Sequence, residues 1–158
     1  MEIERKFLLN EHFHQEILAN QLESHQLVQY YVQVGEVEER YRRQDNLYFH
    51  TIKRRVDGGL QREEIETECT EEDFEANKYH IEGNIIAKNR YIFHYGEHKI
   101  EIDVYDGALK GLIIGEVEFR TKDEANSFIP PDFFGIEVTW DKRYKNQNLA
   151  ISGLPENI

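Results

Sequence analysis

The sequence predicts a mainly β protein, a closed eight-stranded antiparallel barrel with a few peripheral helices. Two observations predict this fold. Apolar and polar residues alternate with a period of two along most of the chain, which is the pattern of strands with one buried face. Short turns separate these segments, so strands that follow one another are expected to pair antiparallel. A barrel is the most economical closure for such strands.

Each expected strand is a short segment rich in β-branched, aromatic or alternating residues. Met1 to Leu9 is expected to form the first strand, with Glu2, Glu4 and Lys6 on one face and Ile3, Arg5 and Phe7 on the other. Segments 27–34 and 37–43 form a hairpin, because only Gly35-Glu36 separates them. The sheet continues in 47–53, 60–69, 86–94, 99–105, 112–120 and 136–139, with a turn signal at Asp57-Gly58-Gly59 before the second of these segments.

Helices are expected where the apolar period lengthens or a cap occurs. Segment 11–22 has helical apolar spacing after Asn10, a residue suited to the N-cap. Thr70, with Asp73 three residues later, approaches a capping box and begins a helix over 71–78. Two further short helices are expected, over 122–128 and over 146–151.

Composition limits the classes of protein that the chain can represent. Its 158 residues fit one domain, residues 1–158, and 39% hydrophobic residues are too many for a disordered acidic chain. A net charge of −12 argues against nucleic acid and anionic membranes as partners. Cys69 stands alone beside acidic residues, so no internal disulfide forms and a thiolate is disfavoured. The expected location is the cytoplasm.

Charged residues are concentrated on one face of the expected strands. Residues two apart share a strand face, and in strand after strand such positions are ionisable. They are Glu2, Glu4 and Lys6; Glu38, Arg40 and Arg42; Arg62, Glu64 and Glu66; Lys88 and Arg90; Glu101 and Asp103; and Glu116, Glu118 and Arg120, with Thr51 and Lys53 as a weaker case.

Two explanations compete for these charged faces. An ordinary half-exposed sheet also places polar residues outward, and for any single strand that is the default explanation. Repetition over six or seven strands favours a barrel with a charged interior, which is costly unless the charges pair or bind ions. An interior with both carboxylates and cations suits a polyphosphate with a hard divalent metal such as Mg²⁺ or Mn²⁺.

A series of motifs along nearly the whole chain resembles one known family. The N-terminal M-E-I-E-R-K-F resembles the E-x-E-x-K signature of the CYTH superfamily, the triphosphate tunnel metalloenzymes. Further matches occur in order at 40–42, 51–53, 62–66, 88–91, 101–105, 115–119, 134–139 and 143–146. The short length and the closing segment look most like the compact bacterial members that hydrolyse inorganic triphosphate.

The resemblance implies a tunnel-forming barrel that requires a divalent metal, two Mg²⁺ or Mn²⁺ ions, and it assigns roles to residues. The candidate metal ligands are Glu2, Glu4, Glu116 and Glu118, with Glu64, Glu66, Glu101 and Asp103 at further acidic tunnel positions. The candidate residues for triphosphate are Lys6, Arg40, Arg42, Lys53, Arg62, Lys88 and Arg90, with Arg143 and Glu137 at other recurrent positions.

The function expected from this resemblance is metal-dependent hydrolysis of inorganic triphosphate. The metals would bind the phosphates and activate water, and either Glu4 or Lys53 would accept the proton of that water. A class IV adenylyl cyclase and a thiamine triphosphatase are alternatives from the same superfamily. A polyphosphate- or nucleotide-binding module without turnover is the alternative from a different class. A homodimer is also expected, because exposed β-surface is often covered in that way.

Overall fold

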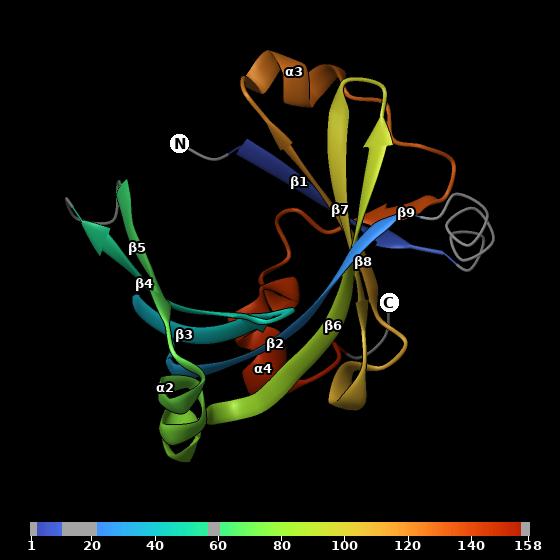
Figure 1. Ribbon diagram of the computed structural model, residues 1–158. Coiled ribbons are helices and arrows are strands. Elements are labelled where there is room, and N and C mark those ends of the chain that lie inside the picture. The colour runs from blue at the N-terminus through green and yellow to red at the C-terminus, as the bar shows by residue number, and fades with distance from the viewer. Residues whose placement is uncertain (1–2, 11–21, 57–60, 156–158) are drawn as a thin grey trace. The chain divides into compact units, whose positions relative to one another are not determined.

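The computed structural model describes residues 3–10, 22–56 and 61–155, and these residues form a mainly β protein (Figure 1). The strands are β1 (Ile3–Leu9), β2 (Glu23–Gln33), β3 (Val37–Gln44), β4 (Leu47–Val56), β5 (Gln61–Cys69), β6 (Glu82–Tyr95), β7 (His98–Tyr105), β8 (Ile113–Phe119) and β9 (Phe134–Glu137). The helices are α2 (Glu71–Ala76), α3 (Lys122–Ser127) and α4 (Asn146–Ser152), with 3-10 turns η2 (Asn77–His80), η3 (Gly107–Leu109) and η4 (Lys142–Tyr144). Within the described ranges, no helix is long and apolar enough to cross a membrane.

The nine strands follow the hydrogen-bonded order β5-β4-β3-β2-β6-β7-β8-β1-β9. Antiparallel ladders join β1 to β8 and β9, β2 to β3, β3 to β4, β4 to β5, and β7 to β8. The predicted mainly β class and antiparallel pairing are therefore confirmed. The order is a linear one among the described residues, and its nine strands correspond to the nine expected segments, one more than the predicted eight-stranded barrel contains.

Local signals in the sequence locate the helices well. The Thr70 hydroxyl accepts a hydrogen bond from the Asp73 amide and the Asp73 carboxylate accepts one from the Thr70 amide, so the capping box is complete. The helix ends at Ala76 rather than at residue 78, because the chain tightens there into η2. Residues 11–21 of the expected first helix, and the turn at Asp57-Gly58-Gly59, lie outside the described residues.

The chain divides into two compact units. Unit 1 comprises residues 1–25, 89–106 and 110–141, and unit 2 comprises residues 26–88, 107–109 and 142–158. Strand β6 belongs to both, with residues 82–88 in unit 2 and residues 89–95 in unit 1.

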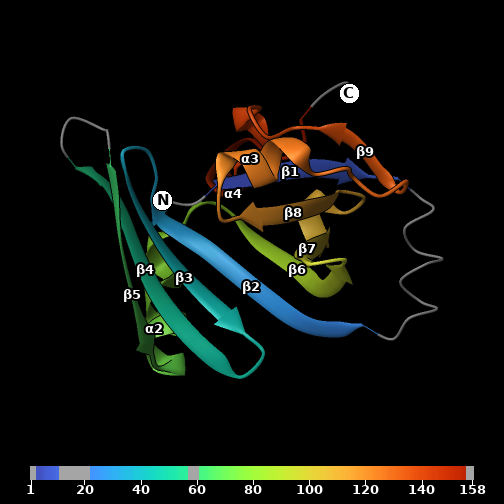
Figure 2. The same cartoon turned by 90° about the horizontal axis from the view of Figure 1, so that it is seen from above.

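The core of unit 1 lies on the apolar face of β1, β7 and β8. Phe7, Ile100 and Val117 are each at most 3% exposed and pack with residues of α3 and of the segment that follows it. Helix α3 contacts β1 and β8, and Figure 2 shows it lying across these strands. This packing leaves the opposite face of the same strands to Glu4, Lys6 and their neighbours.

Gly115 allows a close approach within this core. A Cβ atom at this position of β8 would lie 2.8 Å from Leu9 Cδ1 and 3.0 Å from Phe134 Cε1. Any side chain here would therefore force the side chain of Leu9 or the ring of Phe134 to shift. The glycine keeps β8 close to Phe134, next to the strand positions that carry Glu116 and Glu118.

Unit 2 has an aromatic core on the face of the β2–β3–β4 sheet that α2 covers (Figure 1). The rings of Tyr30 and Tyr41 are stacked with centroids 5.6 Å apart, and Phe74 of α2 packs 5.1 Å from Tyr30. The Tyr30 hydroxyl donates a hydrogen bond to the Phe74 carbonyl, and burial raises the pKa of this phenol. The other face of β2 therefore carries Gln29 and Tyr31.

Candidate functional site

The charged face of unit 1 is formed by three neighbouring strands. Residue pairing places Glu4 of β1 opposite Glu118 of β8, and Lys6 opposite Glu116. Glu116 is in turn opposite Glu101 of β7. Carboxylates from three strands thus lie on one face, with Lys6 of β1 and Lys99 of β7 among them. Like charges directly opposite each other on a sheet are destabilising, so this face favours the binding of cations.

Arg90 of β6 is the main cation that engages the β7 carboxylates. Its Nε donates to Asp103 Oδ1 at 2.8 Å and its Nη2 to Asp103 Oδ2 at 3.0 Å, while Nη1 lies 2.7 Å from Glu101 Oε2. Burial opposes the charge of Arg90, but the hydrogen bonds and charge of Asp103, with Glu101 and Glu116, raise its pKa. Two of the candidate metal ligands are therefore ion-paired to a candidate phosphate-binding residue.

A cavity of about 970 Å³ lies beside this face in unit 1. Glu101, Glu116 and Glu118 line it together with Arg120. These carboxylates supply only oxygen donors, which chemically suit hard divalent cations such as Mg²⁺ and Mn²⁺. Within residues 3–10, 22–56 and 61–155, however, no three His, Cys, Asp or Glu side chains converge closely enough to hold a metal ion together. Glu2, the other expected ligand of the first strand, lies outside these ranges.

The charged face of unit 2 contains a buried arginine. Arg40 of β3 is opposite Thr51 of β4, and Thr51 is opposite Glu66 of β5. Arg40 Nη2 donates to Thr51 Oγ1 at 3.4 Å and lies 3.6 Å from Glu66 Oε1, to which Thr51 donates at 2.8 Å. Thr51 of β4 and Glu66 of β5 therefore both interact with the guanidinium of Arg40 on β3.

Arg40 retains capacity for an acidic ligand. The residue is 6% exposed, and its Nε has no hydrogen-bond partner among the side chains that the structure describes. Glu66, its carboxylate neighbour, is 45% exposed, so solvent weakens that ion pair. A buried N–H without a partner is costly, and a phosphate oxygen would satisfy it.

Two neutral residues of β2, which the sequence analysis did not select, lie opposite the arginines of β3. Gln29 is opposite Arg42, and Tyr31 is opposite Arg40. Gln29 is fully buried and its Oε1 accepts a hydrogen bond from Arg42 Nε at 2.9 Å. Burial raises the pKa of Tyr31 to about 12, and the positive charge of the neighbouring Arg40 limits the rise. The signal that could have found them is the period-two pair Gln29-x-Tyr31, with the polar Gln29 inside the otherwise apolar and aromatic run 27–32.

The remaining candidate lysines of unit 2, Lys53 and Lys88, differ in solvent exposure. Lys53 Nζ is 4.0 Å from Glu64 Oε1, and the two residues are directly opposite each other on β4 and β5. Lys88 of β6 is 1% exposed. Lys53 also lines a cavity of about 290 Å³ with Lys142 and Lys145, two lysines that the sequence analysis did not select.

Two further candidates are Arg143 of η4 and Arg62 of β5. Arg143 lies in η4, with its guanidinium 5.8 Å from the ring centroid of Tyr144. Arg62 belongs to β5, opposite Arg55, but its side chain is outside the described part of the structure.

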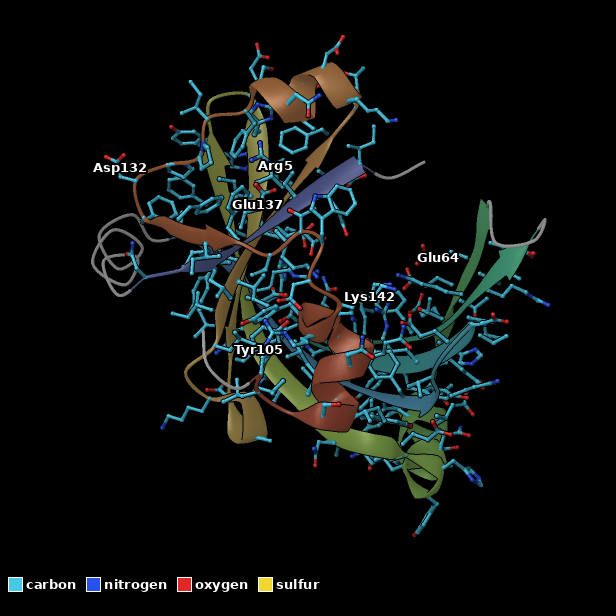
Figure 3. The ribbon with its side chains drawn as sticks, turned by 180° about the vertical axis from the view of Figure 1, so that it is seen from behind. Arg5, Glu64, Tyr105, Asp132, Glu137 and Lys142 are labelled. Carbon is cyan, nitrogen blue, oxygen red and sulfur yellow. The ribbon has the colours of Figure 1, made fainter. Side chains whose placement is uncertain are left out.

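Glu137 pairs with the core side of β1 rather than with its charged side. Arg5 Nε donates to Glu137 Oε2 at 2.9 Å and Nη2 to Oε1 at 2.8 Å, and Figure 3 shows the two side chains pointing toward one another. Arg5 alternates with Glu4 and Lys6 along β1, so its side chain leaves from the opposite face. The hydrogen bonds from Arg5, and one from Thr139, lower the pKa of Glu137.

Cys69 has the chemistry expected of an unreactive thiol. Burial raises its pKa, and the charges of Asp73 and Glu68 raise it further. A thiolate is the nucleophilic form, so this environment disfavours nucleophilic chemistry at Cys69.

These observations define a class of protein. It is a mainly β protein in which, within each unit, one face of the strands presents both carboxylates and cations. Comparison with known proteins identifies the family. The chain is 41% identical over 96% of its length to an inorganic triphosphatase of Nitrosomonas europaea, covering 97% of that protein. It is 40% identical over 58% of its length to an inorganic triphosphatase of Acetivibrio thermocellus. No family model matches the chain.

Solved structures agree with this assignment. The crystal structure of the inorganic triphosphatase NE1496 superposes with a TM-score of 0.72 at 37% identity, covering 96% of this chain and 95% of that one. A putative adenylyl cyclase from Hippeastrum, with a TM-score of 0.58 at 16% identity, shares the fold. The chain belongs to the inorganic triphosphatase family within the CYTH superfamily. The predicted family is therefore confirmed.

Proposed function

We propose that this protein hydrolyses inorganic triphosphate to pyrophosphate and orthophosphate with the help of a divalent metal. Its full-length relative bears the name inorganic triphosphatase at 41% identity. The single observation that best supports the proposal is Arg40, a buried guanidinium whose Nε has no acceptor among the described residues. A small, highly charged anion is the ligand that this arrangement suits.

The cations of the strand faces would bind the phosphate chain. Arg40 and Arg42 have planar guanidinium groups that can each donate two parallel hydrogen bonds to a phosphoryl group. Lysines act as point charges beside them and would stabilise charge that develops on the leaving group. The proposed set is Lys6, Arg40, Arg42, Lys53, Arg62, Lys88, Arg90 and Arg143.

The carboxylates would hold two Mg²⁺ or Mn²⁺ ions. Glu2, Glu4, Glu116 and Glu118 are proposed as the principal ligands, with Glu64, Glu66, Glu101 and Asp103 as further acidic positions. Bound divalent ions neutralise phosphate oxygens and acidify water. Support comes from the oxygen-only donor set on β1, β7 and β8. The closed eight-stranded barrel remains part of the proposal, because the resemblance to the triphosphate tunnel metalloenzymes implies it.

Proton transfer is assigned to one of two side chains. Either Glu4 or Lys53 would accept the proton from the attacking water, and neither needs a covalent intermediate. Glu4 faces Glu118 across β1 and β8, whereas Lys53 lies near Glu64. Variants at both positions separate these roles, since only the base should alter the pH dependence of kcat.

The test is release of orthophosphate from a panel of four substrates. Inorganic triphosphate, pyrophosphate, ATP and thiamine triphosphate are compared with Mg²⁺, with Mn²⁺ and with EDTA. We expect rapid release from triphosphate, little from the other three, and loss of activity in EDTA. Activity that persists in EDTA after dialysis against the chelator would overturn the metal requirement.

The same panel separates the alternatives. Formation of cyclic AMP from ATP would identify a cyclase, and preference for thiamine triphosphate would identify that phosphatase instead. Tight binding of triphosphate without phosphate release would identify a binding module. Sedimentation at several protein concentrations tests the proposed homodimer, which a concentration-independent monomer would exclude.

A further inference from the structure

Gln29 is a fully buried amide directly beneath the arginines of unit 2. It is 0% exposed, and its Oε1 accepts a hydrogen bond from Arg42 Nε at 2.9 Å. Its Nε2 donates to Tyr31 Oη at 3.4 Å. A buried amide is costly unless it is hydrogen-bonded, so a chain that needed only packing here would favour an apolar residue.

In the hydrogen bond between Arg42 and Gln29, the donor is Arg42 Nε. This is the nitrogen whose hydrogen bond best fixes the direction of the guanidinium group. Nε joins the guanidinium to its aliphatic stem, so an acceptor at Nε fixes both the plane and the heading of the group. Recognition of a phosphate by arginine depends on that plane, because two parallel N–H groups must reach two oxygens. Holding Nε from β2 thus fixes the direction of the Nη groups.

The amide itself is oriented by its second neighbour. Gln29 could present either its oxygen or its NH₂ group to Arg42, and only the oxygen can accept. The phenol of Tyr31 takes the NH₂ group, which leaves the oxygen for Arg42. Tyr31 is directly opposite Arg40 on β3, and Gln29 is directly opposite Arg42. One amide and one phenol of β2 therefore lie beside the two arginines of β3.

We propose that Gln29 is a positioning residue that orients Arg42 for triphosphate. The inference rests on the proposed function and adds to it a residue that does not touch the substrate. Because Gln29 acts through the direction of a binding group, its loss raises KM and leaves kcat largely unchanged. A residue needed only for folding would lower the amount of active protein, which changes neither constant of the folded fraction.

The chain supplies a matched control on the same two strands. Gln26 of β2 also accepts a hydrogen bond from an arginine of β3, Arg43 Nη2, at 3.0 Å, but the pair is exposed and Arg43 alternates with Arg42. We expect Gln29→Leu to raise KM for triphosphate about tenfold with kcat within about threefold. Gln26→Leu should leave both constants within about twofold of the unmodified protein.

A double-mutant cycle tests whether Gln29 acts through Arg42. In an Arg42→Ala background, Gln29→Leu should change kcat/KM by less than about twofold, because the group that it orients is gone. A full tenfold effect in that background would overturn the proposal. Gln29→Met is the second variant if Gln29→Leu does not fold, since its flexible side chain fills similar space without an acceptor.

Binding of inorganic triphosphate, measured by calorimetry in EDTA, separates this inference from the proposed function. If the protein binds triphosphate but does not hydrolyse it, the proposed function fails, and a tenfold weaker Kd for Gln29→Leu still supports the inference. If the unmodified protein neither binds nor hydrolyses triphosphate, both fail. If it hydrolyses triphosphate and Gln29→Leu behaves as Gln26→Leu does in KM and Kd, only the inference is overturned.

Discussion

Arg90 and Asp103 form a two-point ion pair between β6 and β7. Both oxygens of the carboxylate accept hydrogen bonds, at 2.8 and 3.0 Å, and the Asp103 side chain is only 10% exposed. Breaking such a pair by removing one partner leaves a buried charge without its neutralising group. The pair therefore contributes to stability as well as to the charge of the candidate site.

Asp103→Asn is expected to destabilise the protein by about 3 kcal/mol, the lower end for a broken buried pair, because Arg90 retains Glu101. Urea unfolding measures the change. Glu101→Gln is the control, since the Glu101 side chain is 35% exposed and its loss should cost less than about 1 kcal/mol. Equal costs for the two variants would contradict the role assigned to the buried carboxylate.

Glu4→Gln is expected to reduce triphosphate hydrolysis at least about a hundredfold, as expected for loss of a general base or of a metal ligand. Stability should change by less than about 1 kcal/mol, because Glu4 is exposed and lies opposite the like charge of Glu118. Steady-state kinetics and urea unfolding on the same preparation measure both quantities.

Glu63→Gln is the matched control for this change. Glu63 is also an exposed strand glutamate, but it alternates with Glu64 on β5 and lies 3.9 Å from Arg54. Its neutralisation should leave kcat/KM within about twofold. Near-normal turnover in a folded Glu4→Gln protein would remove Glu4 from the catalytic set.

Glu137→Gln is expected to lower stability at neutral pH and to lose that effect in acid. The folded-state pKa of Glu137 lies below its ordinary value of 4.5, so its ionisation stabilises the fold above that pH. The contribution disappears as pH falls through the lowered pKa. Urea unfolding from pH 7 to pH 3 should show the two proteins converging below about pH 4.5. A difference independent of pH would show that the charge is unimportant.

Gly115→Ala is expected to destabilise unit 1 by about 1–3 kcal/mol through overpacking. The new Cβ would lie 2.8 Å from Leu9 Cδ1, so shortening that neighbour should relieve the strain. In the Gly115→Ala background, Leu9→Ala should therefore cost less than it does alone, as measured by thermal unfolding. Strictly additive costs would mean that the ring of Phe134 in β9, and not Leu9, moves to accommodate the new Cβ.

The sequence predicted the strands well because alternation is a local property of each segment. The hairpin of β2 and β3, and the capped start of α2 at Thr70, were both located from neighbouring residues. The ends of elements were less accurate, and β6 begins at Glu82 rather than at residue 86. The charged face was predicted from the same alternation, since Glu4, Arg40 and Glu116 do lie on the strands expected.

The parts of the site that could not be predicted depend on distant partners. In the sequence, nothing distinguishes Glu137 from the other glutamates on strands. In the structure, however, it pairs with Arg5, 132 residues away. Gln29 carries no charge, so its role beneath Arg42 follows only from the register of β2 with β3. Pattern identifies the type of residue on a face, and register identifies its partner.

Strand β6 constrains which changes in chain length the protein can accept. Lys88 and Arg90 lie two positions apart on this one uninterrupted strand, one in each compact unit. Deleting or inserting a single residue before Lys88 would turn both cations to the opposite side together. Length variation in relatives should therefore be found at the turns on either side of β6, or as paired insertions with a bulge, and not as single steps within the strand.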